Sequence, residues 1–125
     1  MIEYMTAKEE FVENFKKKTK KYSLDAIKIF QNLPKTEESR IIGKQFLRSA
    51  LSVGANYRAV CRARSKAEFH SKLSIVVEEA DESLFWMEVL VEAEVVKETE
   101  LNYLTDEANQ ILKIAAASRK TVSNK

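Results

Sequence analysis

Glycine and proline are almost absent from this chain, whose 125 residues include only Gly43, Gly54 and Pro34 of these two types. A sheet protein needs many tight turns, and glycine and proline provide much of the backbone geometry that turns require. Their scarcity therefore favours a few long elements. Apolar residues make up 45% and charged residues 32%, which excludes a disordered chain. We expect one domain, residues 1–125, with a core of its own.

Apolar residues recur at spacings of three and four, as one buried helix face requires. Thr6 and Ser65 each precede a glutamate by three residues, the capping-box pattern that begins a helix, and Thr105 fits an N-cap. Pro34 disfavours continuation of the first helix. We predict an all-α fold, an antiparallel up-down-up-down four-helix bundle. The predicted helices span about residues 6–33, 38–62, 65–96 and 105–121.

The buried faces of these helices are expected to include Phe11, Leu51 and Cys61. Cys61 is the only cysteine, so no disulfide can form within the chain, and we interpret it as a core thiol in a reducing compartment. Residues 1–4 show no signal-peptide pattern, and no stretch approaches 18 uninterrupted apolar residues. We expect a cytoplasmic protein without a membrane partner.

The distribution of charge is more informative than its sum, because a net charge of +2 does not by itself indicate a polyanionic partner. In an antiparallel bundle the turn between the second and third helices lies beside the start of the first helix and the end of the fourth. A hairpin that turns near Pro34 brings Lys16 level with about Asn56. Basic residues thus gather at one end and many acidic residues at the other. The candidate nucleic-acid-binding residues are Arg58, Arg62, Arg64, Lys66, Lys17, Lys20 and Tyr57.

Arg58 and Arg62 are four residues apart and share a helix face, so they could straddle backbone phosphates, while Tyr57 could stack on an unpaired base. The alternative is an ordinary solvated or intersubunit-paired surface, because cations near a helix C-terminus are favoured by the helix dipole in any case.

Three other cations are excluded from any binding site, because acidic residues of the third helix are expected to pair with them. Arg48 should lie opposite Asp81 or Glu82, and Arg40 and Lys44 should lie near residues 85–88.

Catalytic and metal-binding patterns are scarce. Four-helix bundles often hold metals through Glu-x-x-His, but the only histidine is His70 and residue 67 is Ala67, so we expect no metal, cofactor or small-molecule substrate. Two glycines cannot supply a phosphate-binding loop. Arg64 and His70 match the Arg-x(4–6)-His spacing of helical ribonucleases of the HEPN type, in which such a pair could stabilise and protonate a leaving group. This spacing is short, so we expect no enzyme and keep a ribonuclease as a remote alternative.

A second apolar stripe on the third helix lies off its main core face. Phe85 and Trp86 are sequence neighbours and point about 100° apart on a helix, so one core cannot take both fully. Either Trp86 is core and Phe85 is exposed, or the stripe meets another subunit. We favour a closed homo-oligomer. Its predicted interface consists of Phe85, Trp86, Val89 and Leu90.

Several segments in order resemble the small bacterial four-helix bundle proteins whose prototypes are encoded in intervening sequences of 23S rRNA genes. The resemblance covers about residues 22–115 and is carried by residues 48–58, 62–69, 72–75 and 79–90. It implies an up-down bundle that assembles as a homopentamer, and distant kinship with accessory proteins of diversity-generating retroelements, which bind nucleic acid through a basic surface. No enzymatic activity is established for the family. Many members have Glu-Gly where this chain has Ala59 and Val60.

These observations favour a non-enzymatic oligomer that binds nucleic acid, RNA in particular, through its basic end. The main alternative is a protein-interaction scaffold without a nucleic-acid partner. In that case Arg58 and Arg62 would pair with Glu78 or Glu82 of a neighbouring subunit.

Overall fold

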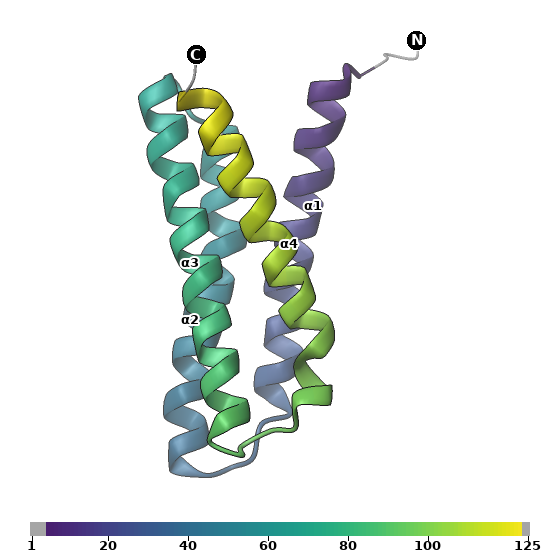
Figure 1. The fold of residues 1–125 in the computed structure, drawn as a ribbon, viewed down its shortest axis with the longest axis vertical. Coiled ribbons are helices and arrows are strands. Elements are labelled where there is room, and N and C mark those ends of the chain that lie inside the picture. Colours follow the sequence, from purple (N-terminus) through teal and green to yellow (C-terminus); the bar gives the residue numbers. More distant parts are fainter. Residues whose placement is uncertain (1–4, 124–125) are drawn as a thin grey trace.

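The computed structural model describes residues 5–123, which form a bundle of long helices with short connections (Figure 1). Consecutive helices run in opposite directions, and no strand occurs within residues 5–123. The predicted all-α antiparallel bundle is therefore confirmed. The helices are α1 (Ala7–Gln31), α2 (Glu37–Cys61), α3 (Lys66–Glu92) and α4 (Glu98–Ser123).

Side-chain caps fix where the first three helices begin. Thr6 and Glu9 form the predicted reciprocal capping box of α1. Ser65 Oγ accepts the Glu68 N–H at 3.0 Å and caps α3. Thr36 Oγ1 accepts the Ser39 N–H and caps α2. This helix therefore begins at Glu37, slightly before the predicted start at about residue 38.

The predicted boundary between the last two helices is wrong. Helix α3 ends at Glu92 and not near residue 96, because Glu94 adopts a left-handed backbone conformation with φ 61°. The Val95 N–H donates to the Leu90 carbonyl and the Glu94 N–H to the Val91 carbonyl, which together make a Schellman motif. Helix α4 then begins at Glu98, not near residue 105.

The segment predicted as a loop before residue 105 is thus the first part of α4. Leu101 and Leu104 within it are buried in the core. Thr105 lies inside the helix and its hydroxyl contacts Met87 Sδ at 3.8 Å, so it is not an N-cap. None of the helices in residues 5–123 has the length and apolar character needed to cross a lipid bilayer.

Contacts between helices confirm the predicted register. The rings of Phe15 and Tyr57 lie 4.6 Å apart, edge to face, which sets α1 against α2 as the hairpin predicts. Arg48 pairs with Glu79 (3.2 Å) and with Glu82, which sets α2 against α3. These contacts therefore fix how α1 and α3 are aligned along the two sides of α2.

One core runs through all four helices and contains polar contacts as well as apolar ones. The Tyr22 hydroxyl lies 2.7 Å from Ser83 Oγ deep inside it. Three residues predicted to face inward do not do so: Phe11 and Leu51 are exposed, and Cys61 is an exposed free thiol beside α1. Although Cys61 is exposed, partial desolvation beside α1 raises the pKa of its thiol more than nearby Lys16 lowers it, so the thiolate is not favoured.

Candidate nucleic-acid interface

The basic end is built around the turn between α2 and α3. Arg58 lies in the last turn of α2, Arg62 is its C-cap, Arg64 is in the turn and Lys66 begins α3. All of them are exposed, and none forms an ion pair within residues 5–123. The sequence-predicted cations of this turn are thus brought together with their charges unneutralised.

Two lysines of α1 join the same half of the molecule. Lys17 and Lys20 are exposed, and the backbone of Lys20 packs against α2 at Gly54. A Cβ atom placed on Gly54 would lie 3.5 Å from Lys20 Cα, so α1 and α2 approach closely here. Both lysines therefore flank the last turns of α2. We call Arg58, Arg62, Arg64, Lys66, Lys17 and Lys20 the basic surface.

Acidic groups moderate this surface without pairing with it. The Glu9 carboxylate accepts the Thr6 N–H, and Glu13 lies close enough to Cys61 to influence its thiol. Two other lysines of α1 do form ion pairs: Lys18 pairs with Glu107, and Lys21 pairs with Asp25. These paired cations differ from those of the basic surface, which form no ion pair within residues 5–123.

The prediction that Tyr57 stacks on a base is contradicted. Only 4% of Tyr57 is exposed, and its ring packs against Phe15. Burial raises the pKa of its phenol well above the ordinary value, as expected for a hydroxyl held away from water. Tyr57 therefore supports the basic surface from inside, and its nearly buried ring is not open for a base to stack on.

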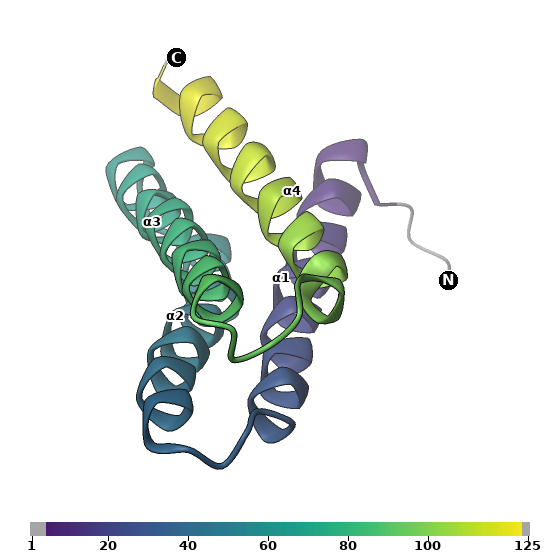
Figure 2. The same cartoon turned by 60° about the horizontal axis from the view of Figure 1, so that its bottom comes forward.

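An open groove beside the basic surface contains a different aromatic side chain. Helices α1 and α4 pack together less closely than the helix pairs that are consecutive in sequence, and they diverge toward the N-terminus of α1 and the C-terminus of α4 (Figures 1 and 2). The groove has a volume of about 650 Å³. It is lined by Lys8, Phe11, Val12, Tyr57, Ala63, Arg64, Ser65, Lys66, Phe69, Leu73, Ser118 and Thr121.

The chemistry of this groove is apolar in its floor and cationic at its rim. Phe11 is 47% exposed, and Phe69 is half-buried. Lys8, Arg64 and Lys66 contribute the charges, and no acidic side chain lines the groove within residues 5–123. Nothing in the sequence pattern singles out Lys8, and the pattern predicts Phe11 in the core, which is wrong. Their spacing of three residues puts both on one helix face, but only the divergence of α4 exposes that face.

The remaining candidate residues are distributed as follows. Arg64 is exposed, whereas His70 is half-buried in α3, where its carbonyl accepts the Ser74 hydroxyl. Arg40 and Lys44 are exposed and form no ion pair within the described residues, which contradicts their predicted pairing. No group of three or more His, Cys, Asp or Glu side chains in residues 5–123 is placed to hold a metal ion.

The predicted oligomer interface is partly exposed. Phe85 is 52% exposed and stacks edge to face on Trp86, with 4.9 Å between ring centroids. Trp86 and Val89 are half-buried, and the indole N–H of Trp86 reaches Glu82 at 3.4 Å. Leu90 is fully buried in the core, so its placement in an interface is wrong. The exposed patch, which we call the Phe85 patch, therefore consists of Phe85, Trp86 and Val89.

Comparison with known proteins places this bundle in a family. A crystal structure of a protein with unknown function from the S23 ribosomal protein family of Bacteroides thetaiotaomicron superposes with a TM-score of 0.82. That protein is 28% identical, and the match covers 87% of this chain and 97% of the other. Comparison with curated proteins found no matching sequence. The sequence matches the 23S rRNA-intervening sequence protein family over residues 13–117, and the chain belongs to that family.

Proposed function

We propose that this protein is a non-enzymatic, cytoplasmic, oligomeric bundle that binds structured RNA through the basic surface. The observation that carries the proposal is the exposed, unpaired state of Arg58, Arg62, Arg64 and Lys66 within the described residues. Other cations of the bundle do form ion pairs, as Arg48 does with Glu79. Unneutralised cations that converge on one end create a field that attracts polyanions.

The geometry favours RNA that contains unpaired nucleotides. Arg58 and Arg62 are one helical turn apart, which suits contacts to successive phosphates. The adjoining groove offers the exposed ring of Phe11, and an aromatic face beside a cationic track is the usual arrangement for binding single strands. Phe11 takes the role first assigned to Tyr57. The family's link to 23S rRNA genes is a further reason to test RNA first.

The oligomer forms part of the same proposal. A half-exposed phenylalanine stacked on a half-buried tryptophan is a favourable anchor for subunit association. The Phe85 patch lies on α3 near its C-terminal end, away from the turn that carries Arg62 and Arg64. Assembly through this patch therefore leaves the basic surface open, and the family resemblance suggests a pentamer. Several basic surfaces in one particle would strengthen RNA binding by multivalency.

Fluorescence anisotropy with a labelled RNA hairpin at several salt concentrations tests the proposal. We expect wild-type affinity to fall steeply with salt, and Arg62→Gln to reduce the slope of log K against log salt by about one unit. Lys97→Gln is the matched control, because Lys97 is an exposed cation between α3 and α4 at the opposite end. Absence of binding by the wild type at low salt, or equal losses in both variants, contradicts the proposal.

A protein-interaction scaffold is the second candidate, and the exposure of Phe85 is the observation that favours it. In that case the Phe85 patch binds another protein and the basic surface binds nothing. The anisotropy experiment separates the two functions. The same samples test for a ribonuclease, since we expect the RNA to remain intact. Cleavage that disappears in His70→Ala would replace the proposed function with an enzymatic one.

A further inference from the structure

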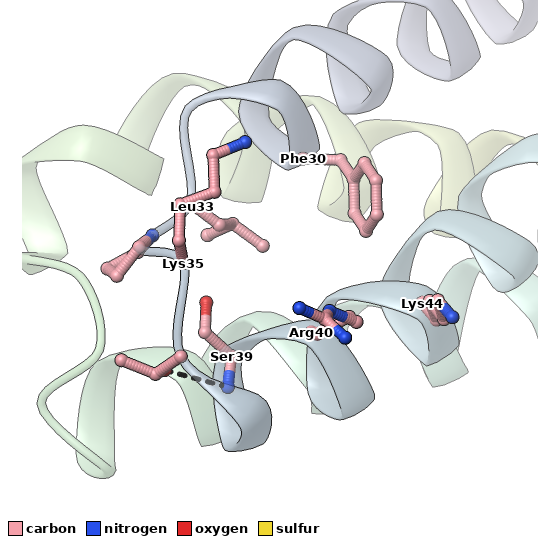
Figure 3. A pocket seen from close by; sticks show the side chains of 8 residues that line it. Phe30, Leu33, Lys35, Ser39, Arg40 and Lys44 are labelled. Atoms are coloured by element: carbon pink, nitrogen blue, oxygen red, sulfur yellow. Dashed lines mark hydrogen bonds between the residues drawn. The ribbon is translucent and has the colours of Figure 1, made fainter.

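A second cationic site lies at the opposite end of the bundle, where the turn after α1 meets the start of α2 (Figure 3). The pocket has a volume of about 270 Å³. Phe30 and Leu33 form an apolar wall, and Lys35, Arg40 and Lys44 contribute cations. It is therefore separate from the basic surface and shares no residue with it.

Ser39 is the unusual residue of this pocket. Its side chain is fully buried, and its hydroxyl has no hydrogen-bond partner within the described residues. In Figure 3 this hydroxyl points away from α2 toward the turn that holds Leu33 and Lys35. The other buried serines differ, since Ser23 donates to the Ala50 carbonyl and Ser49 to the Phe46 carbonyl. Buried hydroxyls are normally satisfied, so an unsatisfied one that faces a pocket suggests an absent acceptor.

The start of α2 adds a further attraction for an anion. Ser39 lies in the first turn of a 25-residue helix, whose N-terminus carries a partial positive charge, while the Ser39 N–H itself donates to the Thr36 hydroxyl. Arg40 and Lys44 are four residues apart on the same face and form no ion pair within residues 5–123. Glu37 and Glu38 share this first turn but do not line the pocket. The lining is thus cationic, with one spare hydrogen-bond donor.

We infer that this pocket binds a phosphate group. A phosphate has enough acceptor oxygens to take hydrogen bonds from the Ser39 hydroxyl and the Arg40 guanidinium together, and its charge near −2 suits the flanking lysines. The apolar wall of Phe30 and Leu33 favours a phosphate attached to a small organic group over the free ion. Leu33 and Lys35 belong to the turn that the Ser39 hydroxyl faces, and the exposed Lys35 side chain can move aside when the ligand enters.

Thermal unfolding of the full-length protein at constant ionic strength tests this inference. We expect the midpoint to rise with inorganic phosphate, and to rise at lower concentration with phenyl phosphate, because a ligand that binds only the folded state stabilises it. Acetate at matched ionic strength should have no comparable effect. Arg40→Gln should weaken the apparent phosphate affinity about tenfold or more. Lys28→Gln, which removes an exposed charge from the last turn of α1 outside the pocket, should leave the affinity unchanged.

Ser39→Ala gives an independent readout. Because the hydroxyl has no partner in the described residues, its removal should leave the midpoint in phosphate-free buffer unchanged or raised, while the response to phosphate is lost. No response of the wild type to either phosphate overturns the inference. So does a response that persists in both Arg40→Gln and Ser39→Ala, or an equal response to acetate. These outcomes do not depend on RNA binding, which Arg40→Gln should leave intact.

Discussion

The contact between α1 and α2 at Gly54 allows a quantitative test of how tightly the basic surface is supported. In Gly54→Ala the new Cβ would lie 2.6 Å from Ser23 Oγ and 3.2 Å from the Thr19 carbonyl oxygen. The Ser23 hydroxyl donates to the Ala50 carbonyl at 2.8 Å, so its displacement breaks a buried hydrogen bond. The Thr19 carbonyl is backbone and can yield only if the helices separate.

The expected change in the free energy of unfolding combines one stabilising effect with two destabilising ones. Alanine in place of glycine inside a helix gains up to about 1 kcal/mol from propensity. Overpacking costs about 1–3 kcal/mol, and the lost hydrogen bond of Ser23 costs about 1 kcal/mol more. We therefore expect Gly54→Ala to lower the free energy of unfolding by about 1–3 kcal/mol. Urea unfolding followed by circular dichroism measures this difference.

Gly43→Ala is the matched control on the same helix. Its new Cβ would meet the side-chain ends of Leu33 (2.6 Å) and Phe30 (3.2 Å), which can move without separating the helices. We expect a change within about 1 kcal/mol, because propensity offsets the rearrangement. In a Ser23→Ala background the cost of Gly54→Ala should shrink, since one clash is gone. A Gly54→Ala variant as stable as wild type would refute the close-packing argument.

Three further predictions concern other parts of the fold. Burial raises the pKa of Tyr22 well above its ordinary value, and the folded state then retains a proton that the unfolded state releases above pH about 10. The free energy of unfolding should therefore be unaffected by this group below that pH and fall above it, and urea titrations should show a shallower fall in Tyr22→Phe. Glu94→Gly should raise the free energy of unfolding in urea by about 1 kcal/mol, because it relieves the left-handed conformation at φ 61°. Phe85→Ser should lower the particle mass measured by light scattering, and an unchanged mass would exclude the Phe85 patch as an interface.

Most of the fold could be predicted from local signals. Thr6 and Ser65 mark helix starts through hydroxyls that satisfy free N–H groups, and Pro34 marks a helix end. The end of α3 carries no such signal. The residue in the left-handed conformation after α3 is Glu94, where glycine would be usual. The end of this helix therefore depends on backbone hydrogen bonds that cannot be predicted from the residue types.

The basic surface was partly predictable for a similar reason. The positions of the turns determine which residues of an antiparallel bundle lie at each end, and they place Arg58 and Arg62 at the end with the turn between α2 and α3. Side-chain direction is harder to predict. Tyr57 adjoins Arg58 in sequence yet faces the core, and Arg40 is level with acidic residues yet lines a pocket at the α1–α2 turn. The exposure of Phe11 depends on the divergence of α4, a property of the whole bundle.

Photocrosslinking with thiouridine-labelled RNA, followed by mass spectrometry of the attached peptides, tests the central proposal most directly. We expect crosslinks on the peptides that contain Arg58 to Lys66 and on the start of α1 around Phe11. Peptides from the opposite end, around Lys97, should be free of label at low and moderate salt. Crosslinks concentrated at that opposite end, or spread evenly over the bundle, would contradict RNA binding by the basic surface.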